Sequence, residues 1–215
     1  MKSRKRTRLR TEGPPLTRDD WLDGAFTAVV EGGFDNLRVL TIAKALRVTC
    51  GSFYWHFTDH ADLLAALLAR WRDRQSAIDL ELQPESSADP QRDLEHVLEV
   101  ALAHIGADLE HLRFELALRG LGRRDAEVAQ LLAEVDAMRL RLFEHKFERL
   151  TGDPKTASEL AIVFYLAVVG SYQALGRPTN PPQMKDYLKH LITKYVIQRH
   201  APANVARNAR AKGRA

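Results

Sequence analysis

Apolar residues recur along most of this chain at intervals of three and four positions, the spacing of one face of an α-helix. The first stripe follows Thr17, which with Asp20 forms a capping-box-like start, and it stops at Gly32 and Gly33. Later helices are expected at about 59–82, 94–111, 114–118, 125–150, 156–175 and 183–199. No segment shows the alternation of a β-strand, so we predict an all-α fold of about nine helices.

Between the first helix and the long helix at 59–82, the pattern predicts two short helices around a tight turn, over about 38–57. Ile42, Ala43 and Leu46 give the earlier helix its apolar stripe. Thr49 is suited to cap the later one through its hydroxyl, and we expect that helix to run from Cys50 to about His56.

The later helix has two dissimilar sides. At about 100° per residue, Phe53 and Phe57 share one side, while Gly51 and Trp55 point the opposite way. Two phenylalanines would anchor the helix, and the glycine would permit close approach of another surface. Seven helical residues span about 10 Å and the major groove of B-DNA is about 12 Å wide, so the pattern favours double-stranded DNA as the partner.

The segment from Thr17 to about Leu67 resembles the helix-turn-helix domain of the TetR family (tetracycline-repressor-like) of transcriptional regulators. The matching residues are Gly33-Phe34, Ile42-Ala43, Leu46, Val48-Thr49, the run from Gly51 to Phe57, Asp59 and Leu63-Leu64. The sequence departs from the family pattern at three places. Arg47 replaces the glycine of the turn and must take positive φ if the turn is kept. Leu37-Arg38 replaces a Thr-Thr pair, which leaves Asn36 as a possible cap, and His60 replaces a lysine.

Candidate DNA contacts follow from the wheel and from the resemblance. The residues expected to face base edges are Thr49, Cys50, Gly51 and Trp55. The residues expected to contact phosphates are Arg38, Lys44, Ser52, Tyr54, His56 and His60.

Charge is distributed unevenly, although the net charge is only +4. Residues 1–10 and 201–215 contain basic side chains and no acidic ones, so the remainder is acidic. Such ends favour either phosphate contacts by flexible arms or simple solvation. We predict a basic arm at 1–14, a DNA-binding domain at 15–75 containing the motif at 38–57, a helical domain at 84–200 and a basic tail at 201–215.

The domain at 84–200 is larger than DNA binding requires. The resemblance implies a homodimer formed by its last two long helices and a small apolar effector that releases DNA. The expected dimer residues are Ala167, Gly170, Ser171, Ala174, Leu188, Leu191, Ile192 and Tyr195. The expected pocket residues are His104, Phe114, Phe143, Phe147, Phe164 and Tyr165, all of which have core packing as their alternative. The function we predict is a homodimeric repressor of a palindromic operator; in the alternative, the C-terminal domain binds a protein partner.

Other chemistry finds little support in the sequence. No catalytic motif is present, and His96, His104, Asp108 and His111 do not complete a metal-ligand set, so we expect neither an enzyme nor a cofactor or metal. Cys50 is the sole cysteine and is either a redox-sensitive thiol or a small packing residue. Neither a secretory signal nor a span of about twenty apolar residues appears, which predicts a cytoplasmic protein with no membrane partner.

Overall fold

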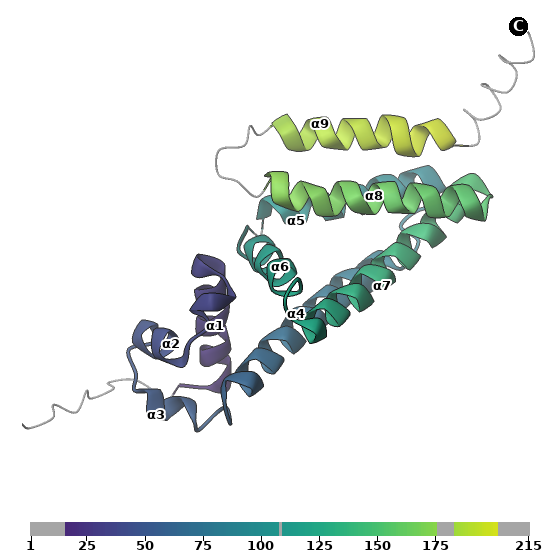
Figure 1. Cartoon of the computed structure of the whole chain (residues 1–215). Helices are drawn as coiled ribbons and strands as arrows, with labels where there is room; N and C mark the ends of the chain where they lie inside the picture. Colours follow the sequence, from purple (N-terminus) through teal and green to yellow (C-terminus); the bar gives the residue numbers. More distant parts are fainter. Residues whose placement is uncertain (1–15, 108, 176–182, 202–215) are drawn as a thin grey trace, which may run out of the picture. The chain divides into compact units, whose positions relative to one another are not determined.

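The structure, a computed structural model, describes residues 16–107, 109–175 and 183–201, with side chains except at 104–107, 172–175 and 183–184 (Figure 1). The predicted basic arm and all of the predicted tail except Ala201 lie outside these residues. The chain divides into two compact units, one ending at Arg72 and the other beginning at Asp73.

The first unit is built from short helices. They are α1 (Arg18–Gly32), a 3-10 turn at Phe34–Asn36, α2 (Val39–Ala45) and α3 (Cys50–Phe53), followed by the start of α4 (His60–Leu82). The predicted capping box of α1 is confirmed: Thr17 Oγ1 accepts from the Asp20 N–H, and Asp20 Oδ2 accepts from the Thr17 N–H at 2.7 Å. These hydrogen bonds from Thr17 lower the pKa of the Asp20 carboxyl. Gly33 ends the helix with a φ of 73°, a backbone conformation that favours glycine.

The second unit contains the end of α4 and five further α-helices. They are α5 (Pro90–Ala107), α6 (Leu109–Leu121), α7 (Ala126–Thr151), α8 (Pro154–Leu175) and α9 (Gln183–Ile192), and α9 continues as a π turn over 193–197 and a 3-10 turn over 198–200. The described residues thus form nine α-helices and no strand, which confirms the all-α prediction. Gly152, in the left-handed conformation with a φ of 66°, ends α7 where the sequence predicted a stop.

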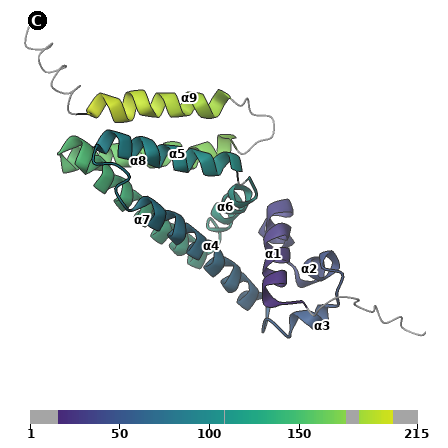
Figure 2. The ribbon, with the colours of Figure 1, turned by 180° about the vertical axis from the view of Figure 1, so that it is seen from behind.

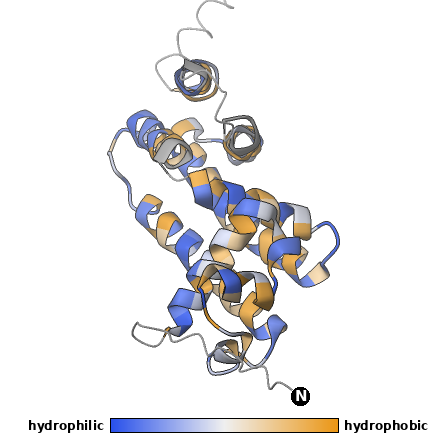
Figure 3. Ribbon diagram, turned by 90° about the vertical axis from the view of Figure 1, so that its left-hand side faces the viewer, coloured by the Kyte–Doolittle hydropathy of each residue, from blue (hydrophilic) through white to orange (hydrophobic). Residues whose placement is uncertain are grey.

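Two helices differ from the sequence prediction in extent. The piece expected around 114–118 is the middle of the longer helix α6, because its apolar stripe continues back to Leu109 and Leu112. The last helix is α-helical only to Ile192 rather than to about residue 199, although the chain stays helical by other hydrogen-bond patterns. Hydrophobic and hydrophilic residues both occur along the helices, as the colours of the ribbon in Figure 3 show.

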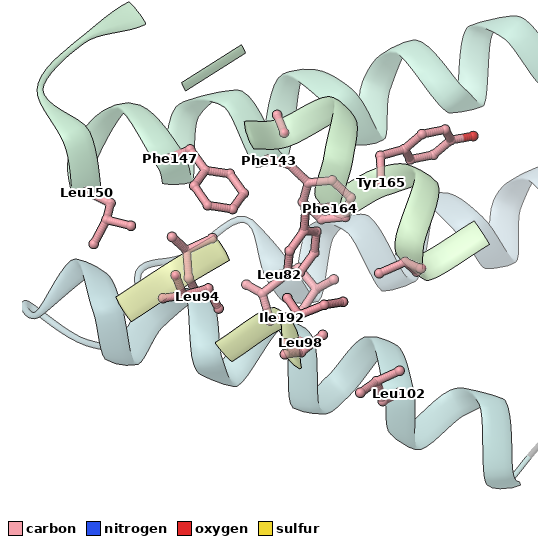
Figure 4. Packing of buried hydrophobic residues seen from close by; sticks show 14 of the residues in the cluster. Leu82, Leu94, Leu98, Leu102, Phe143, Phe147, Leu150, Phe164, Tyr165 and Ile192 are labelled. Atoms are coloured by element: carbon pink, nitrogen blue, oxygen red, sulfur yellow. The ribbon is translucent and has the colours of Figure 1, made fainter. Parts of the chain in front are cut away.

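The core of the second unit is aromatic and aliphatic (Figure 4). Phe164 of α8 meets Phe143 and Phe147 of α7 edge to face, with ring centroids 4.9 and 5.7 Å apart. Helix α5 contributes Leu94, Leu98 and other apolar residues to the same cluster. Such edge-to-face pairs add to the free energy gained from burying apolar area.

A buried ion pair joins α5 to α7. Lys146 Nζ lies 3.0 Å from Asp93 Oδ2, and each side chain is only 1% exposed. Ser86 donates to the same carboxylate, and Arg149 lies 2.9 Å from it. Burial acts to raise the pKa of Asp93, but the hydrogen bonds from Ser86 and Lys146 outweigh it and the net shift is downward. The pair therefore fixes the start of α5 against α7 as a charged contact.

Candidate DNA-binding site

The turn between α2 and α3 is closed by backbone hydrogen bonds around Arg47. The Val48 N–H donates to the Ala43 carbonyl at 2.9 Å, and the Arg47 N–H donates to the Lys44 carbonyl at 3.2 Å. This pair of bonds is a Schellman motif, which needs a left-handed residue after the helix. Arg47 supplies it with a φ of 58°, and it alone among the described non-glycine residues has positive φ. The prediction that Arg47 would be held in this conformation is confirmed.

Helix α3 is shorter than predicted. It ends at Phe53, and Tyr54, Trp55 and His56 form turns, with the His56 N–H donating to the Phe53 carbonyl at 2.9 Å. Thr49 stands at the N-cap position with extended backbone angles, but its side chain makes no capping hydrogen bond there, so that part of the prediction is wrong. The Thr49 backbone carbonyl instead accepts from the Ser52 N–H at 3.1 Å.

The buried side of α3 is anchored by aromatic contacts. Phe53 is fully buried and Phe57 is 2% exposed, as the wheel predicted. Their rings stack with centroids 5.4 Å apart, and Trp21 of α1 meets Phe53 edge to face at the same separation. The Arg18 guanidinium lies over the Phe57 ring, 4.7 Å from its centroid. These contacts hold α3 at a fixed rotation against the rest of the first unit.

The opposite side of α3 is open. Trp55 is 87% exposed and Tyr54 is 66% exposed, an unusual degree of exposure for two adjacent aromatic side chains. A Cβ added to Gly51 would meet only the Thr49 Oγ1, at 3.7 Å. Packing within the first unit therefore does not explain why residue 51 is glycine. The four residues expected to face bases, Thr49, Cys50, Gly51 and Trp55, are exposed or half-buried.

The residues expected to contact phosphate differ in exposure. Arg38, Lys44 and Tyr54 are exposed, whereas Ser52 and His56 are half-buried. Arg38 is the N-cap of α2 and donates from Nε to the Asp35 carbonyl at 3.0 Å. The suggestion that Asn36 caps α2 is wrong, because Asn36 belongs to the preceding 3-10 turn.

His60 has a structural contact as well. Its Nε2 lies 2.6 Å from the carbonyl oxygen of the buried Leu37, a distance at which the nitrogen must donate. Only Nδ1 is then left for a phosphate.

The sequence interpretation did not include Arg47 among the phosphate contacts, although this exposed residue lies in the turn itself. Its replacement of the family's glycine was the signal available.

The dimer residues predicted in α8 and α9 do not share one exposed surface. Ser171 is 4% exposed and donates to the Val168 carbonyl within its own helix, and Ile192 is also 4% exposed. Ala167, Leu188 and Leu191 are half-buried. Gly170 and Tyr195 are exposed, and the side chain of Ala174 lies outside the described residues.

The open face of α8 is rotated from the predicted one. It carries Ile162, Val163 and Leu166, which are 45%, 51% and 61% exposed, and continues at Gly170. At 100° per residue these four positions lie within about 100° of one another. We call them the α8 apolar stripe. Helix α9 runs beside α8 (Figures 1 and 2). Tyr187 of α9 and Tyr195 of the π turn that follows it are also exposed.

Of the predicted pocket residues whose side chains are described, Phe143 and Tyr165 line a cavity. That cavity, of about 50 Å³, is enclosed by α4, α5, α7 and α8; its other lining residues are Gln75, Ile78, Asp79, Leu82, Ala101, Arg139, Val168 and Val169. Phe147 and Phe164 are fully buried core residues, and Phe114 is 1% exposed. The side chain of His104 lies outside the described residues.

A helix-turn-helix unit is thus defined by α2, the Arg47 turn and α3, with α1 and the start of α4 supporting it. Known proteins that this chain resembles belong to the same class. Residues 22–67 match the family described as bacterial regulatory proteins, tetR family. Over 82 residues the chain is 33% identical to the HTH-type transcriptional regulator AcrR of Shigella flexneri, an alignment that spans 38% of each protein.

Solved structures extend the similarity to nearly the whole chain. A transcriptional regulator from Rhodococcus sp. Rha1 superposes with a TM-score of 0.70 at 19% identity, over 85% of this chain and 97% of that one. A TetR-family member from Streptomyces coelicolor A3 gives 0.61 at 22% identity, over 83% and 97%. At these identities the structures show a shared fold, and the N-terminal match specifies the family. Residues 22–67 are therefore a DNA-binding segment of the TetR family of bacterial regulatory proteins, and the chain as a whole shares the fold of the solved regulators.

Two further findings concern the described residues. None of their helices is both long enough and apolar enough to cross a bilayer. They also contain no group of three or more His, Cys, Asp or Glu side chains placed to hold a metal ion.

Proposed function

We propose that this protein regulates transcription by binding double-stranded DNA through the open side of α3. The observation that carries the proposal is the division of α3 and the turn that follows it into a buried side, with Phe53 and Phe57, and an open side with Gly51 and the exposed Trp55. A short helix held in this way offers its open side to the major groove, where base edges are distinguishable.

Within that groove, Thr49, Cys50, Gly51 and Trp55 face the bases. Gly51 lets the backbone approach base edges closely, and the Trp55 ring suits thymine methyl groups and sugars. Arg38, Lys44, Ser52, Tyr54, His56 and His60 hold phosphates around it. We add Arg47 to this set, because its exposed charge sits between α2 and α3.

We also propose that two copies act together. A four-residue α3 offers few base contacts, so a palindrome read by two copies about 34–36 Å apart supplies the affinity that one copy lacks. The α8 apolar stripe supports this proposal, because a contiguous exposed apolar surface of this kind is typical of an interaction site. We include the exposed Tyr187 of α9 and Tyr195 of the following π turn in the same proposed interface, where aromatic side chains are enriched.

Finally, we propose that the protein is a repressor released by a small ligand of the cavity in the second unit. Helix α4 supplies Gln75, Ile78, Asp79 and Leu82 to the cavity wall, and the same helix begins at His60 within the helix-turn-helix unit. A ligand that enlarges the cavity displaces α4. It shifts the DNA-binding equilibrium only if it binds the released state more tightly.

The test of DNA binding is a gel-shift titration with genomic DNA fragments at several salt concentrations. A specific regulator forms a discrete complex whose affinity falls steeply with salt and exceeds its affinity for bulk DNA by about 10³-fold or more. Equal affinity for all fragments would contradict the proposal.

A further inference from the structure

The cavity in the second unit has an uneven balance of charge. Its wall and the layer behind it contain two guanidinium groups, of Arg119 and Arg139, and three carboxylates, of Asp79, Glu115 and Asp136. Arg119 is fully engaged: it holds both Asp136 oxygens at 2.9 and 3.0 Å, and it donates to Glu115 Oε1 at 2.8 Å. Among the described side chains of this cluster, one carboxylate therefore remains in excess.

That excess falls on Asp79. Arg139 donates to Gln75 and also to Glu115 Oε1, at 3.4 Å. Its Nε reaches Asp79 Oδ1 only at 3.8 Å, a distance too long for a hydrogen bond. The second oxygen, Asp79 Oδ2, is buried and has no hydrogen-bond partner among the described residues. Asp79 as a whole is 9% exposed and lines the cavity.

A second buried polar group belongs to the same cavity wall, the hydroxyl of Tyr165, a residue that is 8% exposed. This hydroxyl lies close enough to Asp136 to lower the pKa of that carboxyl by hydrogen bonding, although it makes no hydrogen bond of ordinary geometry in the described part of the chain. Figure 4 shows this hydroxyl directed away from the Phe143–Phe164 cluster. Native proteins leave few such atoms unpaired, because a buried polar atom without a partner costs free energy.

The rest of the wall is apolar. Ile78, Leu82, Ala101, Phe143, Val168 and Val169 line it. A ligand that suits both the polar and the apolar part of the wall must present hydrogen-bond donors and a positive charge at one end, with hydrocarbon or an aromatic ring at the other. A carboxylate ligand would place a like charge next to Asp79, and a purely apolar ligand would leave Asp79 Oδ2 unpaired.

We propose that this cavity binds a primary ammonium ion with a small apolar substituent, whose N–H groups donate to Asp79 Oδ2 and to the Tyr165 hydroxyl. The inference rests on the proposed ligand-responsive function and names the chemical class of its ligand. The present volume of about 50 Å³ fits methylammonium, and a larger substituent requires the cavity to open.

Asp79 also borders a wider groove of about 510 Å³, together with Gln83, Met138, Arg141, Leu142 and His145. The charged and titratable groups around Asp79 are thus Arg139 and Glu115 on the cavity side and Arg141 and His145 on the groove side. Because Arg141 is exposed, water and salt screen its repulsion of an entering cation.

Calorimetric titration of the full chain, without DNA, tests the proposal. The probes are methylammonium, butylammonium and benzylammonium chlorides, with benzyl alcohol as the neutral analogue and benzoate as the anionic one. We expect at least one ammonium ion to bind at least 10-fold more tightly than its neutral analogue, and benzoate not to bind. Equal binding of benzylammonium and benzyl alcohol, or no binding of any ammonium ion, would overturn the proposal.

Two variants identify the residue. Asp79→Asn keeps the shape of the side chain and should weaken ammonium binding at least 10-fold without weakening benzyl alcohol. Glu81→Gln, which removes an exposed carboxylate two residues away on α4, should leave ammonium binding unchanged. Equal losses in both variants would show that net charge, and not the cavity, attracts the cation.

A gel-shift assay with the same probes separates this inference from the function on which it rests. If the protein binds DNA specifically but no ammonium ion binds the free chain, the inference is wrong and the DNA-binding function stands. If ammonium ions bind through Asp79 and do not release DNA, the ligand class stands and ligand-controlled release is wrong.

Discussion

Phe53 and Phe57 stack with ring centroids 5.4 Å apart beneath α3, and Trp55, which lies between them in sequence, is 87% exposed. The two buried rings fix the rotation of α3, so the residues opposite them form a surface of known composition.

Replacing Gly51 should change stability and DNA binding in opposite directions. Alanine in place of glycine raises helix propensity, and the added Cβ meets no atom closer than the Thr49 Oγ1, so Gly51→Ala should stabilise the fold by about 0.5–1 kcal/mol. The same Cβ projects toward the DNA and should weaken specific binding at least 10-fold. Thermal unfolding and a gel-shift titration measure the two effects. Unchanged DNA affinity would show that residue 51 does not approach the bases.

Trp55 and Tyr54 should contribute in different ways. Trp55→Ala should change stability by no more than about 0.5 kcal/mol, because the side chain is largely exposed, and should alter the preferred base pairs. Tyr54→Phe removes a hydroxyl expected to contact phosphate, so it should weaken binding about equally on all sequences. Selection of bound sequences from a random DNA pool, carried out for each variant, distinguishes them. The opposite assignment would mean that α3 lies in the groove at another rotation.

The strained turn offers a separate test. Arg47 holds a φ of 58°, which glycine adopts without steric cost, so Arg47→Gly should stabilise the first unit by up to about 1 kcal/mol. The same substitution removes a proposed phosphate contact and should reduce the salt dependence of DNA binding by about one unit of slope. Arg47→Lys is the matched control, since it keeps both the charge and the strain. A salt slope equal to that of the wild type in Arg47→Gly would remove Arg47 from the phosphate set.

The α8 apolar stripe should control oligomeric state. Leu166→Glu places a charge at the centre of the stripe and should convert a dimer to monomers in sedimentation at micromolar concentration. Leu80→Glu is the matched control, because Leu80 of α4 is 62% exposed, nearly the same as Leu166 at 61%, and lies outside the stripe. A wild-type monomer, or equal dissociation in both variants, would count against a dimer through α8.

The Asp93–Lys146 pair predicts a dependence of stability on pH. The lowered pKa of Asp93 means that its carboxylate stabilises the fold above the ordinary value of 3.8 and loses this contribution as pH falls through the folded-state pKa. Asp93→Asn leaves Lys146 as a buried charge without its main partner, so at pH 7 it should cost about 3–5 kcal/mol. Denaturant unfolding at pH 7 and below pH 4 should show the difference between wild type and variant shrinking at the lower pH. A constant difference would mean that ionisation of Asp93 is not its cause.

Local sequence signals predicted the first unit well because its determinants are close in sequence. The capping box needs only Thr17 and Asp20, and the burial of Phe53 and Phe57 follows from their spacing. Local signals were less reliable for side-chain caps: Thr49 is at the N-cap position but makes no capping hydrogen bond, and Arg38 rather than Asn36 precedes α2. Several backbone conformations can pair the free N–H groups at the start of a helix, so the presence of a polar residue there does not predict which conformation forms.

The second unit was predicted in outline only. Arg139 bonds to Gln75, 64 residues earlier, and Lys146 to Asp93, 53 residues earlier, and no periodic pattern relates such distant polar residues. The open face of α8 depends on where α7, α5 and α9 cover it, so the small residues Ala167 and Ser171 did not identify it. The aromatic residues of this unit were compatible with either core packing or a ligand pocket, and tertiary packing decides which of them line a cavity.

The central claim, that the open side of α3 reads base pairs, is tested most directly by selection of genomic DNA fragments with the purified ligand-free protein at low salt. We predict enriched fragments that share a palindrome with half-site centres about 10–10.5 base pairs apart, or a multiple of that spacing. Gly51→Ala, though folded and at least as stable, should lose the enrichment. Recovery of the same fragments by Gly51→Ala, or recovery of bulk DNA only by the wild type, would contradict the claim.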